Sequence, residues 1–335
     1  MKRPAYLVPG DEIYLVAPSF GCTIDPYLTR LDVSIKNFKR KGFCVIEGPN
    51  IRLNEGVVAS APAKARAKEI EDAFASSAKL VISVGGGELM DEILPELDFE
   101  KLGQYEPKWF MGFSDNANLT FLLTTKLGWM TVYGPCAPQF FQKKWRLAEK
   151  DAYELLQGRK HFEGYPKWSI TRQNANPLIS YRCTQPKIIT SFGFDAPVTG
   201  TLLGGCLDIL QLFPGTRFDD VARFNAEHPE GIIWYLEACD LNPLDLRRTL
   251  FRLKEAHWFD NAKAFLFGRM KRPNVYGFEG IDRFNAVTDM LGELGKPILI
   301  DIDLGHVSPS MPIINGAKAK VSLIEGNIHI DYLDE

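Results

Sequence analysis

The first half of the chain alternates short apolar runs with longer segments in which apolar residues recur at helical spacing. The short runs are typical of buried strands, and the spacing in the longer segments is typical of helices that pack on a sheet. Such alternation predicts a parallel sheet covered by helices on both faces, as in Rossmann-like or flavodoxin-like domains. The expected strands are 12–17, 44–47, 80–84 and 109–111, and the expected helices are 27–41, 63–77, 88–94 and a segment from Asn116 to Gly128.

The pattern loosens between residues 141 and 185 and becomes regular again afterwards. The sequence therefore predicts an N-terminal α/β domain at 1–145, an inter-domain connection at 146–185 and a C-terminal mixed α/β domain at 186–335. In this last domain the expected strands are 196–202, 231–236, 264–267, 297–301 and 319–323, and the expected helices are 206–213 and 244–256.

The net charge of the chain and the distribution of its basic residues favour a small substrate. The 335 residues carry a formal net charge of −3 and contain no long run of Lys or Arg. A nucleic-acid partner or an anionic membrane surface is therefore not expected, and a small molecule or peptide fits better. Acidic and turn-forming residues interrupt the apolar runs near the N-terminus, so neither a signal peptide nor a membrane span is expected there.

Cysteine and histidine spacing bears on compartment and metal content. The six cysteines form no CxxC pair, which favours free thiols, most of them buried, in a reducing cytoplasm. The five histidines show no HExxH or HxH spacing. We therefore expect no metal site and no cofactor.

Three predicted strands end in segments that suit ligand binding, namely 17–19, 85–87 and 112–114. Because the carboxyl ends of parallel strands meet at one edge, these loops are expected to converge. Consecutive glycines at 85–87 allow backbone N–H groups to approach an anion or an oxyanion closely. The segment lacks the GxGxxG spacing and a following GK[ST], so a phosphate cradle, a plain turn and an oxyanion site all stay open.

Ser114 lies at a predicted strand-to-helix turn, where it is either a nucleophile or the N-cap of the helix. A nucleophilic serine needs a base and a group that orients the base. His306 is the candidate base, because it follows an apolar strand in the loop DIDLGHVSPSMP. Glu237 is the candidate carboxylate, because it directly follows the strand GIIWYL; its alternative role is an ion pair with Arg247 or Arg248.

Seven segments of the chain, and the order in which they occur, resemble the LD-carboxypeptidase family of serine peptidases, which also contains the microcin C immunity peptidases. They cover nearly the whole chain. The segments are PGDEIYLVAPSF, SVGGGELMDEILPELDF, KWFMGFSDNANL, GWMTVYGPCAP, GTLLGGCLDIL, IIWYLEACDLNPLDLRRTLFRL and ILIDIDLGHVSPSMPIINGAKAKV.

The resemblance implies a Ser114–Glu237–His306 triad, with an active site between the two domains. It also implies an oxyanion hole formed by the backbone N–H groups of Gly86 and Asp115. A homodimer is expected from the resemblance alone.

A carboxypeptidase must also bind the terminal carboxylate of its substrate. Arg247 and Arg248, a few residues beyond Glu237, are candidates for this contact. Trp168 is a loose positional match to the tryptophan that stacks an adenine in the microcin-immunity branch.

The chain departs from the family pattern at three places. Cys206 stands where the family commonly has Asn, and Ala238 stands where Asp is frequent. Leu241 replaces a lysine of the microcin-immunity branch.

Three functional hypotheses follow. The first is a cytoplasmic serine carboxypeptidase that cleaves an L,D-peptide bond, such as the terminal D-Ala of a murein tetrapeptide in cell-wall recycling. The second is a hydrolase of peptidyl-nucleotides or related acylated amides. The third is a non-catalytic two-domain ligand-binding protein.

Overall fold

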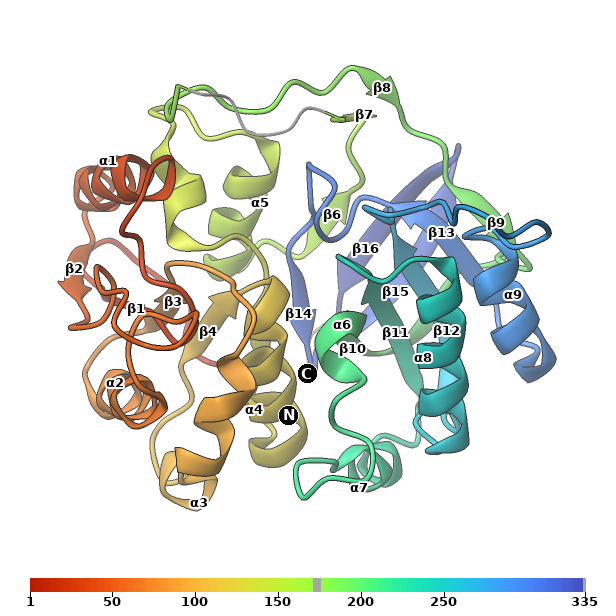
Figure 1. The fold of residues 1–335 in the computed structure, drawn as a ribbon, viewed down its shortest axis with the longest axis horizontal. Coiled ribbons are helices and arrows are strands. Elements are labelled where there is room, and N and C mark those ends of the chain that lie inside the picture. The colour runs from red at the N-terminus through yellow and green to blue at the C-terminus, as the bar shows by residue number, and fades with distance from the viewer. Residues whose placement is uncertain (171–175, 334–335) are drawn as a thin grey trace. The chain divides into compact units, whose positions relative to one another are not determined.

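The computed structural model describes residues 1–170 and 176–333 (Figure 1). Contacts divide the chain into two compact units. The first comprises Met1–Arg159 with the described part of Thr171–Tyr181, and the second comprises Lys160–Ile170 with the chain from Arg182 onward. Among the described residues, no helix is both long enough and apolar enough to cross a membrane.

The first unit contains the predicted parallel sheet. Its strands lie in the order β2-β1-β3-β4-β5, and each pairs with its neighbour in parallel. This is the flavodoxin-like strand order, so the predicted fold class is confirmed. The strands are β1 Glu12–Val16, β2 Cys44–Glu47, β3 Leu80–Ser83, β4 Trp109–Gly112 and β5 Thr131–Tyr133.

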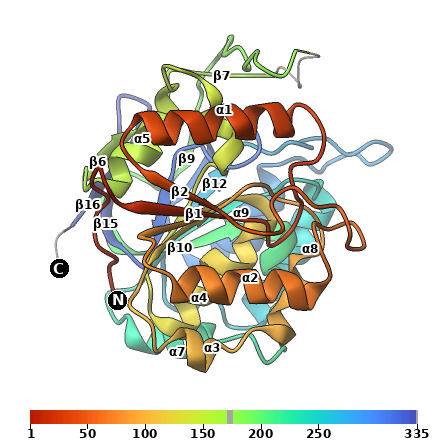
Figure 2. The same ribbon diagram turned by 90° about the vertical axis from the view of Figure 1, so that its left-hand side faces the viewer.

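Helices cover both faces of this sheet. Figures 1 and 2 show α1 and α5 on one face and α2 and α4 on the other. Helix α4 ends where Gly128 adopts the left-handed conformation with φ 68°, a common way to terminate a helix. The helical segments are α1 Tyr27–Arg40, α2 Ala63–Ala75, η1 Met90–Glu96, α3 Phe99–Leu102, η2 Ser114–Asn116, α4 Ala117–Leu127, η3 Ala137–Phe141 and α5 Leu147–Leu156.

Two segments of this unit differ from the sequence expectation. The short helix expected at 88–94 is a 3-10 helix, η1, which contains Pro95; proline cannot donate the backbone hydrogen bond of a regular helix. The stretch 146–185, interpreted as a connection, begins with the regular helix α5. Its buried face includes Ala148 and Ala152, whose small side chains give a weak periodic signal.

The second unit is built on a mixed sheet in the order β6-β16-β15-β10-β11-β12-β13-β9. Strands β10 to β13 pair in parallel, and the flanking strands are antiparallel. The strands of this sheet are β6 His161–Glu163, β9 Thr190–Phe192, β10 Val198–Cys206, β11 Ile232–Glu237, β12 Ala262–Gly268, β13 Ile298–Ile302, β15 Lys318–Ile324 and β16 Asn327–Tyr332.

Shorter elements complete this unit. Strands β7 Lys167–Trp168 and β8 Gln185–Pro186 form an antiparallel pair, and β14 spans Ile313–Asn315. The helical segments are α6 Leu207–Leu210, α7 Val221–Glu227, α8 Pro243–Glu255, α9 Asn285–Leu291 and η4 Gly292–Leu294. Helix α8 starts where sequence suggested, because the Asn242 side chain accepts the backbone N–H groups of Leu244 and Asp245. The helix expected at 206–213 is only the single turn α6, and the buried Phe213 beyond it lies outside the helix.

Candidate active site

Ser114 lies two residues after the end of β4 and begins η2, which leads into α4. Its φ of 64° lies in the left-handed region, which costs a non-glycine residue roughly 1–2 kcal/mol. The backbone N–H of Ser114 donates to the Tyr133 hydroxyl at 3.0 Å. Asn116, and not Ser114, occupies the N-cap position of α4. A strained residue between a strand and a helix is the backbone setting of a nucleophile elbow.

The side chain of Asp115 ties together the loops that follow β1, β3 and β4. Its Oδ2 accepts the Ser19 hydroxyl at 2.5 Å and the Met90 N–H at 3.0 Å, and its Oδ1 accepts Asn118 Nδ2 at 3.1 Å. Burial raises the pKa of Asp115 from 3.8 to about 6, although the bonds from Ser19 and Met90 oppose the rise. This role was not predicted from sequence, which assigned Asp115 only a backbone N–H in the oxyanion hole.

Gly86 lies against the serine. A β-carbon built on Gly86 would lie 3.0 Å from Ser114 Cβ and 3.2 Å from Ser114 Oγ. The carbonyl of Gly86 accepts the N–H of Phe20 at 3.1 Å, and the carbonyl of Gly85 accepts Asn116 Nδ2 at 2.9 Å. The glycine loop therefore lies beside Ser114, and these bonds join it to the loops after β1 and β4.

In the second unit, Glu237 is the last residue of β11, and His306 lies in the loop after β13. Glu237 Oε2 and His306 Nδ1 are 2.9 Å apart. The Glu237 side chain is 0% exposed and that of His306 is 13% exposed. The sequence left an ion pair with an arginine as the alternative role of Glu237. In the structure the Glu237 carboxylate contacts His306. A buried carboxylate on one ring nitrogen orients an imidazole for proton transfer at the other.

The surroundings of His306 favour its charged form. Burial alone would lower the pKa of the imidazole, but the negative charge of Glu237 and hydrogen bonds to Cys239 and Glu237 outweigh it. The pKa of His306 is therefore raised above its ordinary value. Glu237 thus stabilises the imidazolium that forms when the ring accepts a proton.

Asp208 fixes the loop that follows Glu237. Its carboxylate accepts the backbone N–H groups of Cys239 at 2.9 Å, Asp240 at 2.9 Å and Leu241 at 3.2 Å. The sequence signal for Asp208 was its place two residues beyond the carboxyl end of β10, but no motif distinguished it from a surface acid. Leu241, which departs from the family lysine, is held here through its backbone.

The proposed substrate-binding residues have partners of their own within the second unit. Arg247 Nη1 lies 2.7 Å from Asp289 Oδ2, and Arg248 Nη1 lies 3.2 Å from Asp245 Oδ1. Trp168 donates its indole N–H to the Pro186 carbonyl at 3.0 Å.

One cluster at the candidate site has the donor types of a metal site. Ligand atoms of Cys206, Glu237 and His306 lie within 4.8 Å of one another. Burial, followed by the charges of Glu237 and Asp208, raises the pKa of the Cys206 thiol well above its ordinary value. The uncharged thiol of Cys206 is therefore favoured, and the Glu237 carboxylate of this cluster already contacts His306 Nδ1 at 2.9 Å.

Comparison with known proteins matches both halves of the chain. Residues 13–134 match the family model described as "LD-carboxypeptidase N-terminal domain", and residues 199–321 match "LD-carboxypeptidase C-terminal domain". The putative carboxypeptidase YocD of Bacillus subtilis is 28% identical over 96% of this chain and 96% of its own.

One further relative and two solved structures are similar to this chain. The microcin C7 self-immunity protein MccF of Escherichia coli is 24% identical over 97% of this chain and 94% of its own. A structure of MccF in complex with aspartyl sulfamoyl adenosine matches with a TM-score of 0.81 at 22% identity, covering 98% of both chains. The structure of a muramoyltetrapeptide carboxypeptidase from Oxalobacter formigenes matches with a TM-score of 0.73 at 23% identity, covering 96% of this chain and 99% of that one.

Proposed function

The chain belongs to the LD-carboxypeptidase family, and on that premise we propose that it is a serine carboxypeptidase that cleaves an L,D-peptide bond, such as the terminal D-Ala of a murein tetrapeptide. The triad consists of Ser114, Glu237 and His306. The observation that carries this proposal is the 2.9 Å contact between buried Glu237 and His306, which supplies an oriented base.

Each triad member has a defined task in the proposed reaction. His306 takes the proton from the Ser114 hydroxyl while the serine oxygen attacks the peptide carbonyl carbon. Glu237 holds the imidazole through Nδ1 and stabilises its cation. The imidazolium then returns the proton to the leaving amino group, and water hydrolyses the acyl-enzyme.

The backbone N–H groups of Gly86 and Asp115 form the oxyanion hole in this proposal. Each such donor contributes about 3 kcal/mol to lowering the barrier. The close approach of Gly86 to Ser114 supports the assignment, since a β-carbon on Gly86 would lie 3.0 Å from Ser114 Cβ and would force the serine to shift. Arg247 or Arg248 binds the terminal carboxylate, exchanging Asp289 or Asp245 for the substrate.

A second candidate function is hydrolysis of a peptidyl-nucleotide or related acylated amide. Its support is the relationship to MccF, whose solved structure contains an aspartyl sulfamoyl adenosine. Trp168 stacks the nucleobase in this alternative. The same triad performs the chemistry, so the two candidates differ only in substrate.

Product analysis separates the candidates. The protein is incubated with a murein tetrapeptide and, separately, with a peptidyl-adenylate, and released D-Ala or nucleotide is followed by mass spectrometry. The first proposal expects D-Ala from the tetrapeptide, and retention of D-Ala rules it out. If neither substrate is cleaved and Ser114 does not react with an active-serine probe, the third hypothesis, a non-catalytic ligand-binding protein, is favoured.

We also propose that the enzyme is a homodimer and that it is located in the cytoplasm. Six free cysteines, of which Cys22, Cys136 and Cys206 are buried, support a reducing compartment. The proposal of a dimer is based on the family resemblance, and light scattering of the purified protein measures the oligomeric state.

A further inference from the structure

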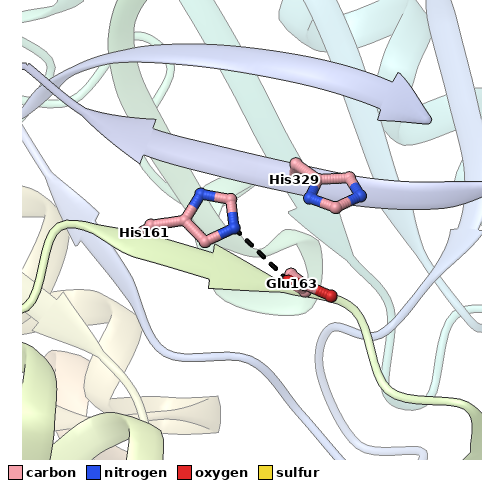
Figure 3. A group of neighbouring side chains, drawn as sticks. All are labelled: His161, Glu163 and His329. Carbon is pink, nitrogen blue, oxygen red and sulfur yellow. Dashed lines mark hydrogen bonds and ion pairs between the residues drawn. The ribbon is translucent and has the colours of Figure 1, made fainter.

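An exposed group of histidine and carboxylate side chains lies on the second unit, formed by residues that are far apart in the sequence. Strand β6 pairs antiparallel with β16, which places Glu163 opposite His329 and His161 opposite Asp331. Alternate residues of a strand share one face, so all four side chains lie on the same face of the sheet. Figure 3 shows the rings of His161 and His329 and the carboxylate of Glu163 gathered there.

The atoms that could bind a metal ion are close to one another. One ligand atom from each of His161, Glu163 and His329 lies within 4.8 Å of the others. His161 Nε2 and Glu163 Oε1 are 3.4 Å apart. Two ligands of a tetrahedral zinc ion, each about 2.1 Å from the metal, are separated by about 3.4 Å, so this pair already has the required spacing.

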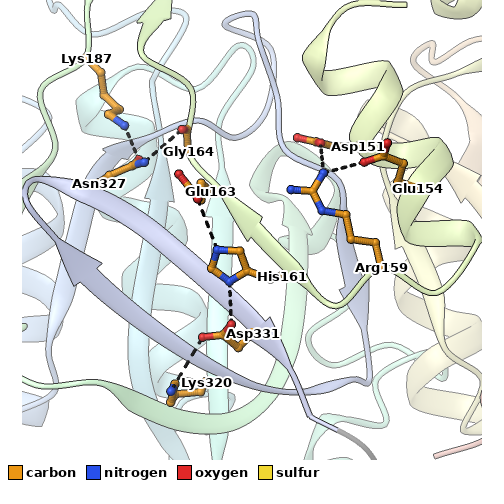
Figure 4. Close-up of polar contacts among 10 residues, drawn as sticks. All are labelled: Asp151, Glu154, Arg159, His161, Glu163, Gly164, Lys187, Lys320, Asn327 and Asp331. Carbon is orange, nitrogen blue, oxygen red and sulfur yellow. Dashed lines mark hydrogen bonds and ion pairs between the residues drawn. The ribbon is translucent and has the colours of Figure 1, made fainter.

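Asp331 orients His161 as a metal ligand. Its Oδ1 lies 2.7 Å from His161 Nδ1, so the other ring nitrogen, Nε2, faces Glu163 (Figure 4). Metal-binding histidines commonly donate their second N–H to a carboxylate, which fixes the tautomer and increases ligand basicity. Lys320 Nζ lies 3.9 Å from the other carboxylate oxygen, Asp331 Oδ2.

The backbone that carries these ligands is held in place. Gly164, which follows β6, donates its N–H to the Ile328 carbonyl at 2.9 Å. Its carbonyl accepts Asn327 Nδ2 at 3.2 Å, and Asn327 Oδ1 accepts the ammonium group of Lys187 (Figure 4). These contacts fix the register of β6 on β16, so little reorganisation is needed to bind an ion.

We propose that His161 Nε2, the His329 imidazole and the Glu163 carboxylate bind one Zn²⁺ ion on the exposed edge of the sheet, with water as the fourth ligand. Two imidazoles and one carboxylate suit zinc, while Mg²⁺ and Ca²⁺ require mainly oxygen ligands. The ion clamps β6, an edge strand, to β16. The sequence expectation of no metal site rested on spacing along the chain, whereas pairing of β6 with β16 assembles this one.

Calorimetric titration of the chelator-treated, full-length protein with ZnCl₂ tests the site. One ion per chain is expected. His329→Ala should weaken binding by at least tenfold, and Asp331→Asn by about 10–100-fold, because it weakens the hydrogen bond that orients His161. His257→Ala is the matched control, since His257 is exposed and lies 3.2 Å from a carboxylate oxygen of Asp260 but has no second histidine beside it in the described structure.

Two further measurements keep the result unambiguous. The His306→Ala variant lacks one ligand of the Cys206, Glu237 and His306 cluster. Zinc should still bind to this variant, at the site of His161, Glu163 and His329, with unchanged affinity. X-ray absorption of the bound ion should show two imidazole ligands. Absence of binding, binding that survives both His161→Ala and His329→Ala, or binding lost in His306→Ala overturns the proposal. Circular dichroism confirms that each variant is folded.

Discussion

Replacing Asp115 by Asn tests whether its carboxylate holds the loops around Ser114. The side chain receives hydrogen bonds from Ser19, Met90 and Asn118. An asparagine of the same size has one acceptor oxygen, which can keep the bonds from Ser19 and Met90. Its NH₂ group then faces the NH₂ group of Asn118, so that bond is lost.

Two opposing terms set the size of the effect at pH 7. Loss of one charge-assisted bond and weakening of two others cost about 3–5 kcal/mol. Burial raises the pKa of Asp115 from 3.8 to about 6, so its charge costs the folded state about 3 kcal/mol at pH 7, and asparagine removes this cost. The net loss of unfolding free energy is about 0–2 kcal/mol.

The pH dependence of this loss is the diagnostic result. An acid whose pKa is higher in the folded state takes up a proton on folding, so its contribution becomes more favourable as pH falls from 7 toward 4. The wild-type protein should therefore gain about 1 kcal/mol over Asp115→Asn between pH 7 and pH 5. Urea denaturation of both proteins at the two pH values measures the difference.

Asp98→Asn is the control, because Asp98 caps α3 at an exposed position and asparagine caps a helix equally well. Its stability should equal that of the wild type within a few tenths of a kcal/mol. A stability difference between Asp115→Asn and wild type that stays constant or shrinks from pH 7 to pH 5 would refute the reasoning.

Three further predictions concern the proposed triad and oxyanion hole. Glu237→Gln should lower kcat/KM about 10⁴-fold and shift the acid limb of the pH profile to lower pH, because His306 loses the charge that raises its pKa; an unshifted limb argues against the pair. Gly86→Ala should lower kcat about 100-fold by displacing Ser114. Gly85→Ala is the control and should retain most activity, because its β-carbon meets nothing closer than 3.5 Å. Equal kcat values for the two variants would contradict this prediction. Ser114→Gly should be more stable than Ser114→Ala by about 0.5–1 kcal/mol in thermal unfolding, because only glycine relieves the φ of 64°, and the reverse order would exclude strain.

Periodicity along the chain predicted most of the sheets. The runs LVIS and WFMG are apolar apart from Ser83, because these strands are buried on both faces, and glycine or proline marks their ends. Helix α5 was missed because alanines at 148 and 152 form much of its buried face and contribute little to an apolar pattern.

The candidate site was predictable to the extent that its residues follow strands. Ser114 and Glu237 come at the ends of β4 and β11, where chemistry is expected in an α/β sheet. Asp115 and Asp208 act through backbone N–H groups of distant loops, and sequence spacing carries no information about such contacts. The pairing of His161 with His329 likewise depends on strand register, which is set by long-range packing.

The most direct test of the central claim is covalent labelling of the folded protein with an active-serine probe, followed by peptide mass spectrometry. The account predicts one adduct, on Ser114, that disappears in Ser114→Ala and forms far more slowly in His306→Ala. Labelling at another serine, or cleavage of the tetrapeptide that persists in Ser114→Ala, would contradict it.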